Sequence, residues 1–421
     1  MVERERERER ERAREPGTGE RAVRGRTVTE GAMGQRSVTE GARRQRAMTE
    51  EAMGQRTMRR EPVAEEPDGP RWAEDALAAV WRRTRETEAQ VGTRFPLYAD
   101  PGTGVWRSTS KGSWTGGFWA GLLWLRALDS GAERDRQAAA VCTGRLAHWV
   151  GQDTATRGLI FWYGTALAAG PGDDGAAAQL RDRAARACLA AYDAERGLVP
   201  WGDAFGGPRL VARADAVPGL VPLLAGRGPD GADAASAQLT RQLTLSLSEH
   251  PPRPAWRAAP DGTWNACSEP APGWSRTVPW LLLGVVDGLH CLGQQGLWEA
   301  AEGLVAPRLG AGVPLVPRAY DGRPDGPMDT SAAAIEAVAL LKLAALLRAV
   351  GREEEAGPPG RRARRILHRL STAHLSANGG LTASCYDADR GLAPCHELIW
   401  GDFFLAAGLA MLTGRTDPFA T

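Results

Sequence analysis

From Arg71 to the end of the chain, apolar residues recur at spacings of three and four, the pattern of helices with one buried face. This spacing predicts helices at about 71–90, 114–130, 134–150, 157–169, 175–192, 214–226, 231–248, 274–292, 295–307, 329–350, 359–375 and 398–413. Clusters of Gly and Pro separate these segments, and no segment shows a convincing strand-like alternation. The pattern therefore predicts an all-α domain.

The connections between the predicted helices alternate between short and long. The short ones, suited to αα-hairpins, lie at 131–133, 170–174, 227–230 and 293–294. The long ones, rich in Trp, Gly, Pro and Asp, lie at 91–113, 193–213, 249–273, 308–328 and 376–397. In an up-and-down helical array this alternation places all the long loops at one end, and long loops in a compact domain usually carry function.

We therefore expect residues 69–421 to form an (α/α)6 toroid, a barrel of six helical hairpins with a site in its mouth on the long-loop side. An open superhelical solenoid is the alternative architecture. No repeat of fixed period is visible in this part of the chain, which disfavours the solenoid.

Residues 1–68 have a different composition from the rest. Arg and Glu alternate up to Arg14, and a ten-residue repeat then occupies Thr27–Arg36, Ser37–Arg46 and Ala47–Arg56. Such a segment has few large apolar side chains and cannot bury enough surface to offset its conformational entropy. We predict a disordered low-complexity tail, for which the sequence indicates no function.

The overall composition excludes several classes of function. The 421 residues include 52 Lys and Arg against 51 Asp and Glu, a net charge of +1, whereas nucleic-acid and membrane-surface binders need a basic excess. The six Cys form no C-x-x-C pair and the six His have no metal-ligand spacing, so we expect no metal and no cofactor. The start lacks the apolar core of a signal peptide, and the apolar stretches are too short to span a bilayer. We predict a cytoplasmic protein; its oligomeric state stays open.

Tryptophan indicates the class of ligand. The chain has 15 Trp against 7 Phe and 5 Tyr. Several lie in or beside the long loops: Trp106, Trp114, Trp119, Trp201, Trp264, Trp274 and Trp400. An indole combines a broad apolar face with one hydrogen-bond donor, which suits the C–H faces and polar rims of sugar rings. We predict a cleft for a small saccharide, although any one of these residues could instead pack a helix end.

Among the loop carboxylates, Asp215 stands out because its neighbours Ala214, Ala216, Val217 and Pro218 are apolar. Desolvation favours the protonated carboxyl that a general acid requires, so Asp215 is the candidate catalytic residue. The alternative is a simple helix cap. Among the histidines, His396 in the last long loop is the candidate site residue.

Four segments, in order, resemble motifs of the unsaturated glucuronyl hydrolases of glycoside hydrolase family 88. They are Trp114–Leu125 (WTGGFWAGLLWL), Trp274–Trp280 (WSRTVPW), Asp329–Leu341 (DTSAAAIEAVALL) and Leu398–Leu405 (LIWGDFFL). The resemblance implies an (α/α)6 barrel, in agreement with the alternation of the loops.

The resemblance also implies a reaction and a set of site residues. In the family, an Asp protonates the C4=C5 double bond of a terminal unsaturated uronic acid and assists the addition of water at C5, after which the hemiketal opens. This differs from displacement between two carboxylates. Asp215 takes the acid/base role, Arg276 the substrate carboxylate, and Trp114 and Trp201 line the sugar site. Asp153 and His396 complete the predicted substrate-binding residues.

The sequence departs from the family at several of these positions. The family motif D-T-H-D-L-G-F carries a His-Asp pair at the site, where Asp153–Leu159 (DTATRGL) has Ala155 and Thr156. Asp215 lies one residue from the register of the family's catalytic Asp. The Gln that follows the motif arginine is Val278, and Asn265 stands where the family has a His.

Three functions therefore compete. The first is a glycoside hydrolase of this type that acts on an unsaturated or related uronic acid. The second is a divergent, inactive saccharide-binding protein with the same fold. The third is another (α/α)6 sugar enzyme, such as an epimerase, which requires two opposed site histidines where only His396 is well placed.

Overall fold

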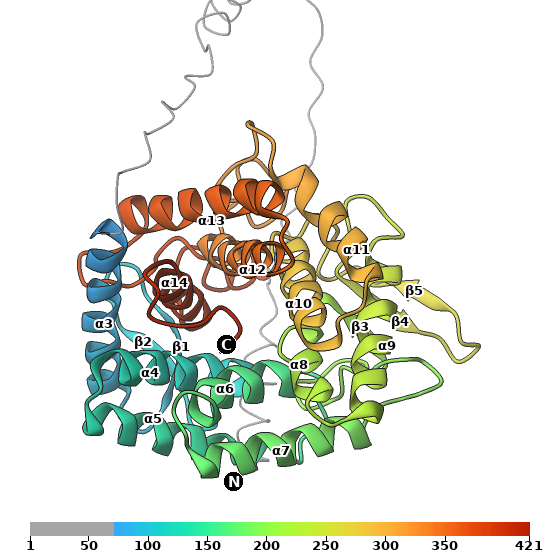
Figure 1. The fold of residues 1–421 in the computed structure, drawn as a ribbon, viewed down its shortest axis with the longest axis horizontal. Helices are drawn as coiled ribbons and strands as arrows, with labels where there is room; N and C mark the ends of the chain where they lie inside the picture. Colours follow the sequence, from blue (N-terminus) through green and yellow to red (C-terminus); the bar gives the residue numbers. More distant parts are fainter. Residues whose placement is uncertain (1–70) are drawn as a thin grey trace, which may run out of the picture. The chain divides into compact units, whose positions relative to one another are not determined.

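Residues 71–421 fold into a ring of helices that follow one another around the ring in chain order (Figure 1). The computed structural model describes these residues, which belong to the second of two units in the chain, Glu66–Thr421. The predicted disorder of 1–68 falls on residues outside the described part. The last inner helix packs against the first outer one, which closes the ring. The prediction of an (α/α)6 toroid is confirmed, and the solenoid is excluded.

Six inner helical segments alternate with six outer helices within residues 71–421. The outer helices are α3 (Arg71–Val91), α5 (Glu133–Arg145), α7 (Gly175–Ala190), α9 (Pro229–Ser246), α11 (Gly296–Val305) and α13 (Glu353–Ala373). The inner helices are α4 (Gly116–Ser130), α6 (Tyr163–Ala169), α8 (Leu220–Ala225), α10 (Thr277–Leu292), α12 (Thr330–Ala349) and α14 (Ile399–Leu412). Shorter turns are η1 (Ser113–Thr115), η2 (Leu146–Trp149), the π-turn η3 (Gly158–Trp162), η4 (Ala214–Ala216) and η5 (Ala306–Arg308).

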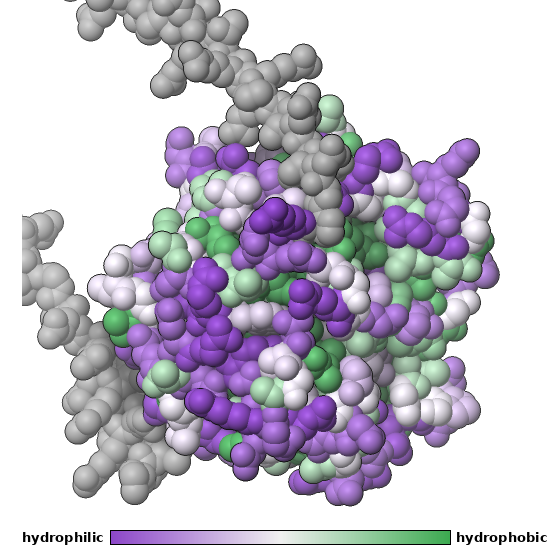
Figure 2. Space-filling view, turned by 60° about the vertical axis from the view of Figure 1, so that its left-hand side comes forward, coloured by the Kyte–Doolittle hydropathy of each residue, from purple (hydrophilic) through white to green (hydrophobic). Residues whose placement is uncertain are grey.

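The inner helices are apolar around most of their circumference because both faces are covered. Nearly all of α14 is buried, whereas α13 buries one stripe and exposes its charged face. Helix α12 is long and apolar enough to span a membrane by length and composition, yet 83% of its apolar window is buried inside this ring. The side of the ring that carries α3 is largely hydrophilic (Figure 2), as expected for outer helices with one apolar stripe.

The expectation of an all-helical domain misses two small antiparallel sheets in the long loops. One has the order β2 (Trp106–Thr109), β1 (Phe95–Ala99), β6 (Glu397–Leu398). The other has the order β3 (Val211–Arg213), β4 (Ala255–Ala258), β5 (Trp264–Ala266). These strands have two to five residues, too few for an alternation to be recognised among the loop residues. The sheets stiffen the loops around the mouth.

The predicted helix at 214–226 is interrupted. Gly219 has φ +70°, and a Cβ at this position would lie 2.5 Å from the carbonyl oxygen of Gly158. The chain therefore makes the short turn η4 before α8 begins at Leu220. This break holds Asp215 in a turn at the end of the inner helix.

Candidate active site

The six inner helices all begin at the end of the ring where the long loops lie, because every long loop leads from an outer helix into an inner one. We call this end the mouth. The positive ends of six helix dipoles point toward it, which favours a ligand with a negative charge.

Arg276, at the start of α10, is buried in the wall of the mouth. Its Nη1 donates to Asp329 Oδ2 (2.7 Å) and to the carbonyl of Cys385 (2.5 Å), and Nη2 donates to the carbonyl of Tyr386 (2.8 Å). Asp329 is fully buried, caps α12 and also accepts from Ser275 Oγ at 2.7 Å. The observed hydrogen bonds of Arg276 thus tie three segments of the protein together.

An aromatic cluster lies beside Arg276. Trp114 Nε1 donates to the Tyr386 hydroxyl (3.0 Å), and the rings of Trp114 and Trp400 lie 4.9 Å apart. The Arg276 guanidinium lies 4.7 Å from the ring of Trp274 and 5.7 Å from that of Trp400. Trp114 is half-buried, so its ring both packs into this wall and keeps some exposed surface.

Asp215 lies in η4 and forms an ion pair with Arg213, the last residue of β3. The guanidinium donates from Nε (2.8 Å) and Nη2 (2.9 Å) to the two carboxylate oxygens. Arg213 also stacks on Trp201, with 4.4 Å between the guanidinium carbon and the ring centroid. The two charged side chains are 22% and 16% exposed, in contrast to 7% and 0% for Arg276 and Asp329.

The two Arg–Asp pairs belong to neighbouring loops. Tyr320 lies near Arg213, and its backbone pairs with that of Trp274, which stacks on Arg276. Trp201, Asp215 and Arg276 therefore come from the same end of the ring, as the sequence predicts.

The segment that replaces the family's His-Asp pair also lies against this region. The N–H of Ala155 donates to the carbonyl of Trp201 (3.1 Å). Thr156 is buried, with its hydroxyl 2.8 Å from that of Thr154. The position holds a hydroxyl satisfied by a neighbour and supplies no carboxyl group.

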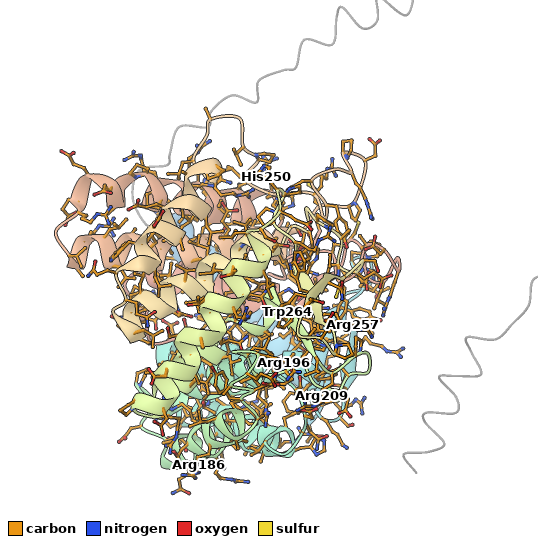
Figure 3. All side chains as sticks on the ribbon, turned by 90° about the vertical axis from the view of Figure 1, so that its right-hand side faces the viewer. Arg186, Arg196, Arg209, His250, Arg257 and Trp264 are labelled. Carbon is orange, nitrogen blue, oxygen red and sulfur yellow. The ribbon has the colours of Figure 1, made fainter. Side chains whose placement is uncertain are left out.

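Asp153 lies on the rim, where it accepts from Arg209 Nε at 2.7 Å. Arg209 lies on the same side of the molecule as Arg196, Arg257 and Trp264 (Figure 3), beside the β3–β4–β5 sheet. Asp153 is thus held in an exposed ion pair near the mouth.

His396 lies behind the aromatic cluster. Its backbone pairs with Ser384, and its ring meets Tyr98 edge-on at 5.5 Å. Tyr98 in turn contacts Tyr386, at 6.0 Å between centroids. The buried Nδ1 of His396 has no hydrogen-bond partner. His396 is thus in contact with the aromatic cluster through Tyr98.

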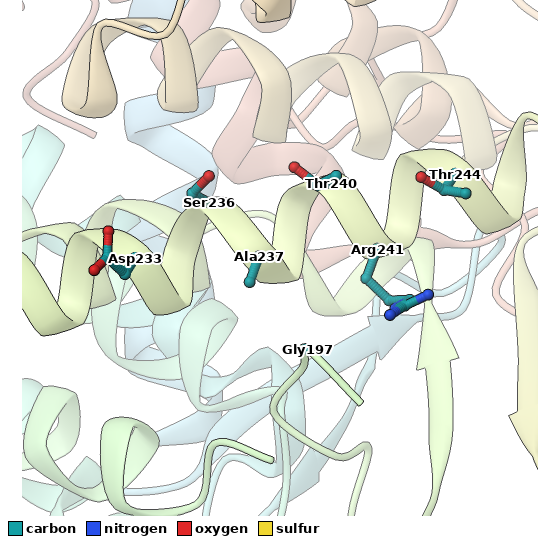
Figure 4. A pocket seen from close by; sticks show the side chains of 7 residues that line it. All are labelled: Gly197, Asp233, Ser236, Ala237, Thr240, Arg241 and Thr244. Carbon is teal, nitrogen blue, oxygen red and sulfur yellow. The ribbon is translucent and has the colours of Figure 1, made fainter. Parts of the chain in front are cut away.

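Within residues 71–421, no group of three or more His, Cys, Asp or Glu side chains is arranged to hold a metal ion. A shallow groove of about 360 Å³ lies on the exposed face of α9 and the loop at Gly197, lined by Ser236, Thr240 and Arg241 among others (Figure 4). None of the predicted site residues lines it.

Sequence reasoning missed Arg213 and Tyr386. Arg213 has a local signal, because it is an oppositely charged residue only two positions before Asp215. Tyr386 has none, since its contacts to Trp114 and Arg276 join segments more than a hundred residues apart.

Comparisons with known proteins agree with this geometry. No protein-family model matches the chain. The unsaturated glucuronyl hydrolase of Bacillus sp. (strain GL1) is 25% identical over 372 residues, which cover 80% of this chain and 95% of that protein. A solved variant of such a hydrolase (UGL) with dGlcA-Glc-Rha-Glc has a TM-score of 0.73 at 22% identity, covering 80% of this chain and 96% of that chain. A solved unsaturated glucuronyl hydrolase specific for heparin has a TM-score of 0.72 at 20% identity, covering 82% and 98%. The chain is thus similar to unsaturated glucuronyl hydrolases over about four fifths of its length.

Proposed function

We propose that the protein is a glycoside hydrolase that releases a terminal unsaturated or related uronic acid from a small saccharide. The observation that carries this proposal is the relationship to unsaturated glucuronyl hydrolases over 95% of the length of the Bacillus enzyme. The mouth of the ring supports it, because it combines exposed tryptophan surface, a carboxylate and an accessible guanidinium.

In this reaction Asp215 is the acid/base residue. Its carboxylate is partly exposed, whereas that of Asp329 is fully buried. A general acid must carry a proton, whereas the two hydrogen bonds from Arg213 are made to the ionised form of Asp215. Substrate binding therefore has to loosen this pair before Asp215 can donate.

The Arg213–Asp215 pair can open when Arg213 binds the substrate carboxylate instead. A guanidinium that holds one carboxylate through two parallel hydrogen bonds can hold a substrate carboxylate in the same geometry. A uronate that binds Arg213 competes with Asp215 for the same donors. The released Asp215 carboxylate can then take up a proton from water, which it donates to C4 of the C4=C5 bond, and it accepts a proton back from the water that adds at C5. Arg276 remains a predicted ligand of the substrate carboxylate, but its observed hydrogen bonds go to protein acceptors.

The remaining predicted residues act in binding. Trp114 and Trp201 present their rings to the sugar, the latter together with the stacked Arg213. Asp153 on the rim and His396 behind Tyr98 stay predicted substrate-binding residues.

A saccharide-binding protein without catalysis is the second candidate, and the Ala155–Thr156 segment favours it. Thr156 offers only a hydroxyl that is already bonded to Thr154. Without a second carboxyl beside Asp215, turnover of standard unsaturated glucuronides should be weak.

A screen of unsaturated uronyl disaccharides separates the two candidates. Hydrolysis consumes the double bond, so its ultraviolet absorbance should fall with time in the presence of the protein. Binding without loss of absorbance, abolished in Trp114→Ala and Trp201→Ala, supports the non-catalytic candidate instead. The cytoplasmic location and the absence of a nucleic-acid or membrane partner stay predictions.

A further inference from the structure

A second cavity lies away from the mouth, between α7 and the ends of α8 and α10, which are neighbours in the ring (Figure 1). Its volume is about 520 Å³, within the range of ligand pockets for small molecules. One part of its wall is apolar, formed by Ala178, Ala185, Pro222 and Leu223. The remainder carries the polar groups described next.

The polar groups on this wall are mostly donors that lack a partner. The N–H groups at Nε1 of Trp162 and Nε of Arg227 are buried and donate a hydrogen bond to no neighbouring group. Arg181 is half-buried and makes none of the hydrogen bonds or ion pairs found among the described residues. A buried donor without an acceptor is unfavourable, so two such groups beside the half-buried Arg181 around one cavity indicate a place for acceptor oxygens.

The charges on this wall do not cancel. Asp182 is the carboxylate of the lining, and it already pairs with Arg227 and with Arg186, the latter at 2.5 Å. Arg181 is left without a counter-ion, and burial lowers the pKa of its guanidinium. A cation in this situation is stabilised by a bound anion.

We propose that this cavity is a binding site for a compact anion, supplied either as a free inorganic oxyanion or as the phosphate of a monosaccharide. Arg181 forms the principal charge contact, and the N–H groups of Trp162 and Arg227 donate to the remaining oxygens. The apolar wall faces the body of a sugar, if the anion carries one. The site is independent of the function proposed for the mouth.

Calorimetric titration of the full chain with inorganic phosphate, at constant ionic strength, tests this assignment. Phosphate should bind saturably, and Arg181→Gln should weaken binding at least about tenfold, because a charge-assisted contact is lost. Trp162→Phe keeps the ring and removes the donor, and it should weaken binding to a smaller extent. Arg183→Gln is the matched control, since Arg183 is exposed on the same helix and does not line the cavity.

A titration with glucose 6-phosphate distinguishes the two sources of the anion. Tighter binding than that of inorganic phosphate indicates a sugar phosphate, and equal binding indicates the free oxyanion. Arg213→Gln should leave both affinities unchanged, which separates this cavity from the mouth. The proposal is overturned if millimolar phosphate does not bind, or if Arg181→Gln binds it as well as the wild type does.

Discussion

Two Arg–Asp pairs at the mouth, Arg276–Asp329 and Arg213–Asp215, each have their arginine against a tryptophan ring, and they differ in almost every other respect. Arg276 and Asp329 are buried and bonded to several further groups, including two backbone carbonyls and a serine. Arg213 and Asp215 are partly exposed and bonded to each other through two parallel hydrogen bonds.

This difference suggests a structural role for the buried pair and a role in ligand binding for the partly exposed pair. A charge buried among several fixed partners cannot leave them without a large cost, so the first pair holds α10, α12 and the loop at Tyr386 together. A partly exposed pair is worth little to stability, because water can replace either partner. The second pair can therefore open for a ligand, and the following variants test the contrast.

The largest effect is expected from Asp215→Asn. Loss of general acid–base assistance should lower kcat about 10²–10⁴-fold on any unsaturated uronide that the wild type hydrolyses, with the melting temperature nearly unchanged. Steady-state kinetics and thermal unfolding measure the two quantities. Asp261→Asn, in a loop where the carboxylate bonds only Thr263, is the control and should keep full activity. Undiminished turnover in Asp215→Asn would remove this residue from the mechanism.

Arg276→Gln should mainly affect stability. The change leaves the carboxylate of Asp329 buried without its cation, which typically costs about 3–5 kcal/mol of unfolding free energy. Urea denaturation measures this loss. Arg209→Gln, which breaks the exposed pair with Asp153, should cost no more than about 1 kcal/mol. Equal losses in the two variants would contradict the assignment of Arg276 to the framework.

Arg213→Gln should show the opposite profile. Loss of a charge-assisted contact to the substrate carboxylate should lower kcat/KM about 10–100-fold, whereas the unfolding free energy should change by less than about 1 kcal/mol. Arg213→Lys should not restore activity, because an ammonium group lacks the two parallel donors and the planar face that stacks on Trp201. A stability loss as large as that of Arg276→Gln would contradict the claim that the Arg213–Asp215 pair contributes little to stability.

The smallest expected effect is a pH dependence of the unfolding free energy that comes from Asp402, on the buried side of the mouth. Asp402, on the same helix as Trp400, is buried beside Glu397, and both burial and this neighbour raise its pKa well above the usual range. Because the folded-state pKa lies above the unfolded one, the contribution of Asp402 to stability is complete below about pH 4 and is lost as the pH rises through the folded value.

The unfolding free energy of the wild type minus that of Asp402→Asn should therefore fall with rising pH, by at most about 1.4 kcal/mol per pH unit. Urea denaturation at a series of pH values measures the slope. Asn keeps an oxygen that can accept from the N–H of Leu381, as Asp402 does at 2.8 Å. A difference that is independent of pH would show that water reaches this side of the mouth.

Much of the fold follows from the sequence alone. The spacing of apolar residues is a local property, and it located most helices of the ring to within a few residues. The exceptions are α6 and α8, which begin at Tyr163 and Leu220 where the predicted starts are 157 and 214, and α13. This helix begins at Glu353, ahead of the predicted start at 359, because it continues through Pro358 and Pro359. The alternation of loop lengths is also local, and it placed the mouth. The small sheets were missed because β1 pairs with β6 across some three hundred residues.

The contacts of the candidate site are likewise of two kinds, some between residues close in sequence and some between distant segments. Asp215 and Arg213 are two residues apart, so their pairing is inherent in the short strand and turn that carry them. The partners of Arg276 lie 53, 109 and 110 residues away along the chain. Sequence alone therefore determined which residue types gather at the mouth. Only the tertiary structure decided that Arg276 is buried among protein acceptors and that Arg213 is partly exposed, because the burial of a charge depends on distant segments that folding brings around it.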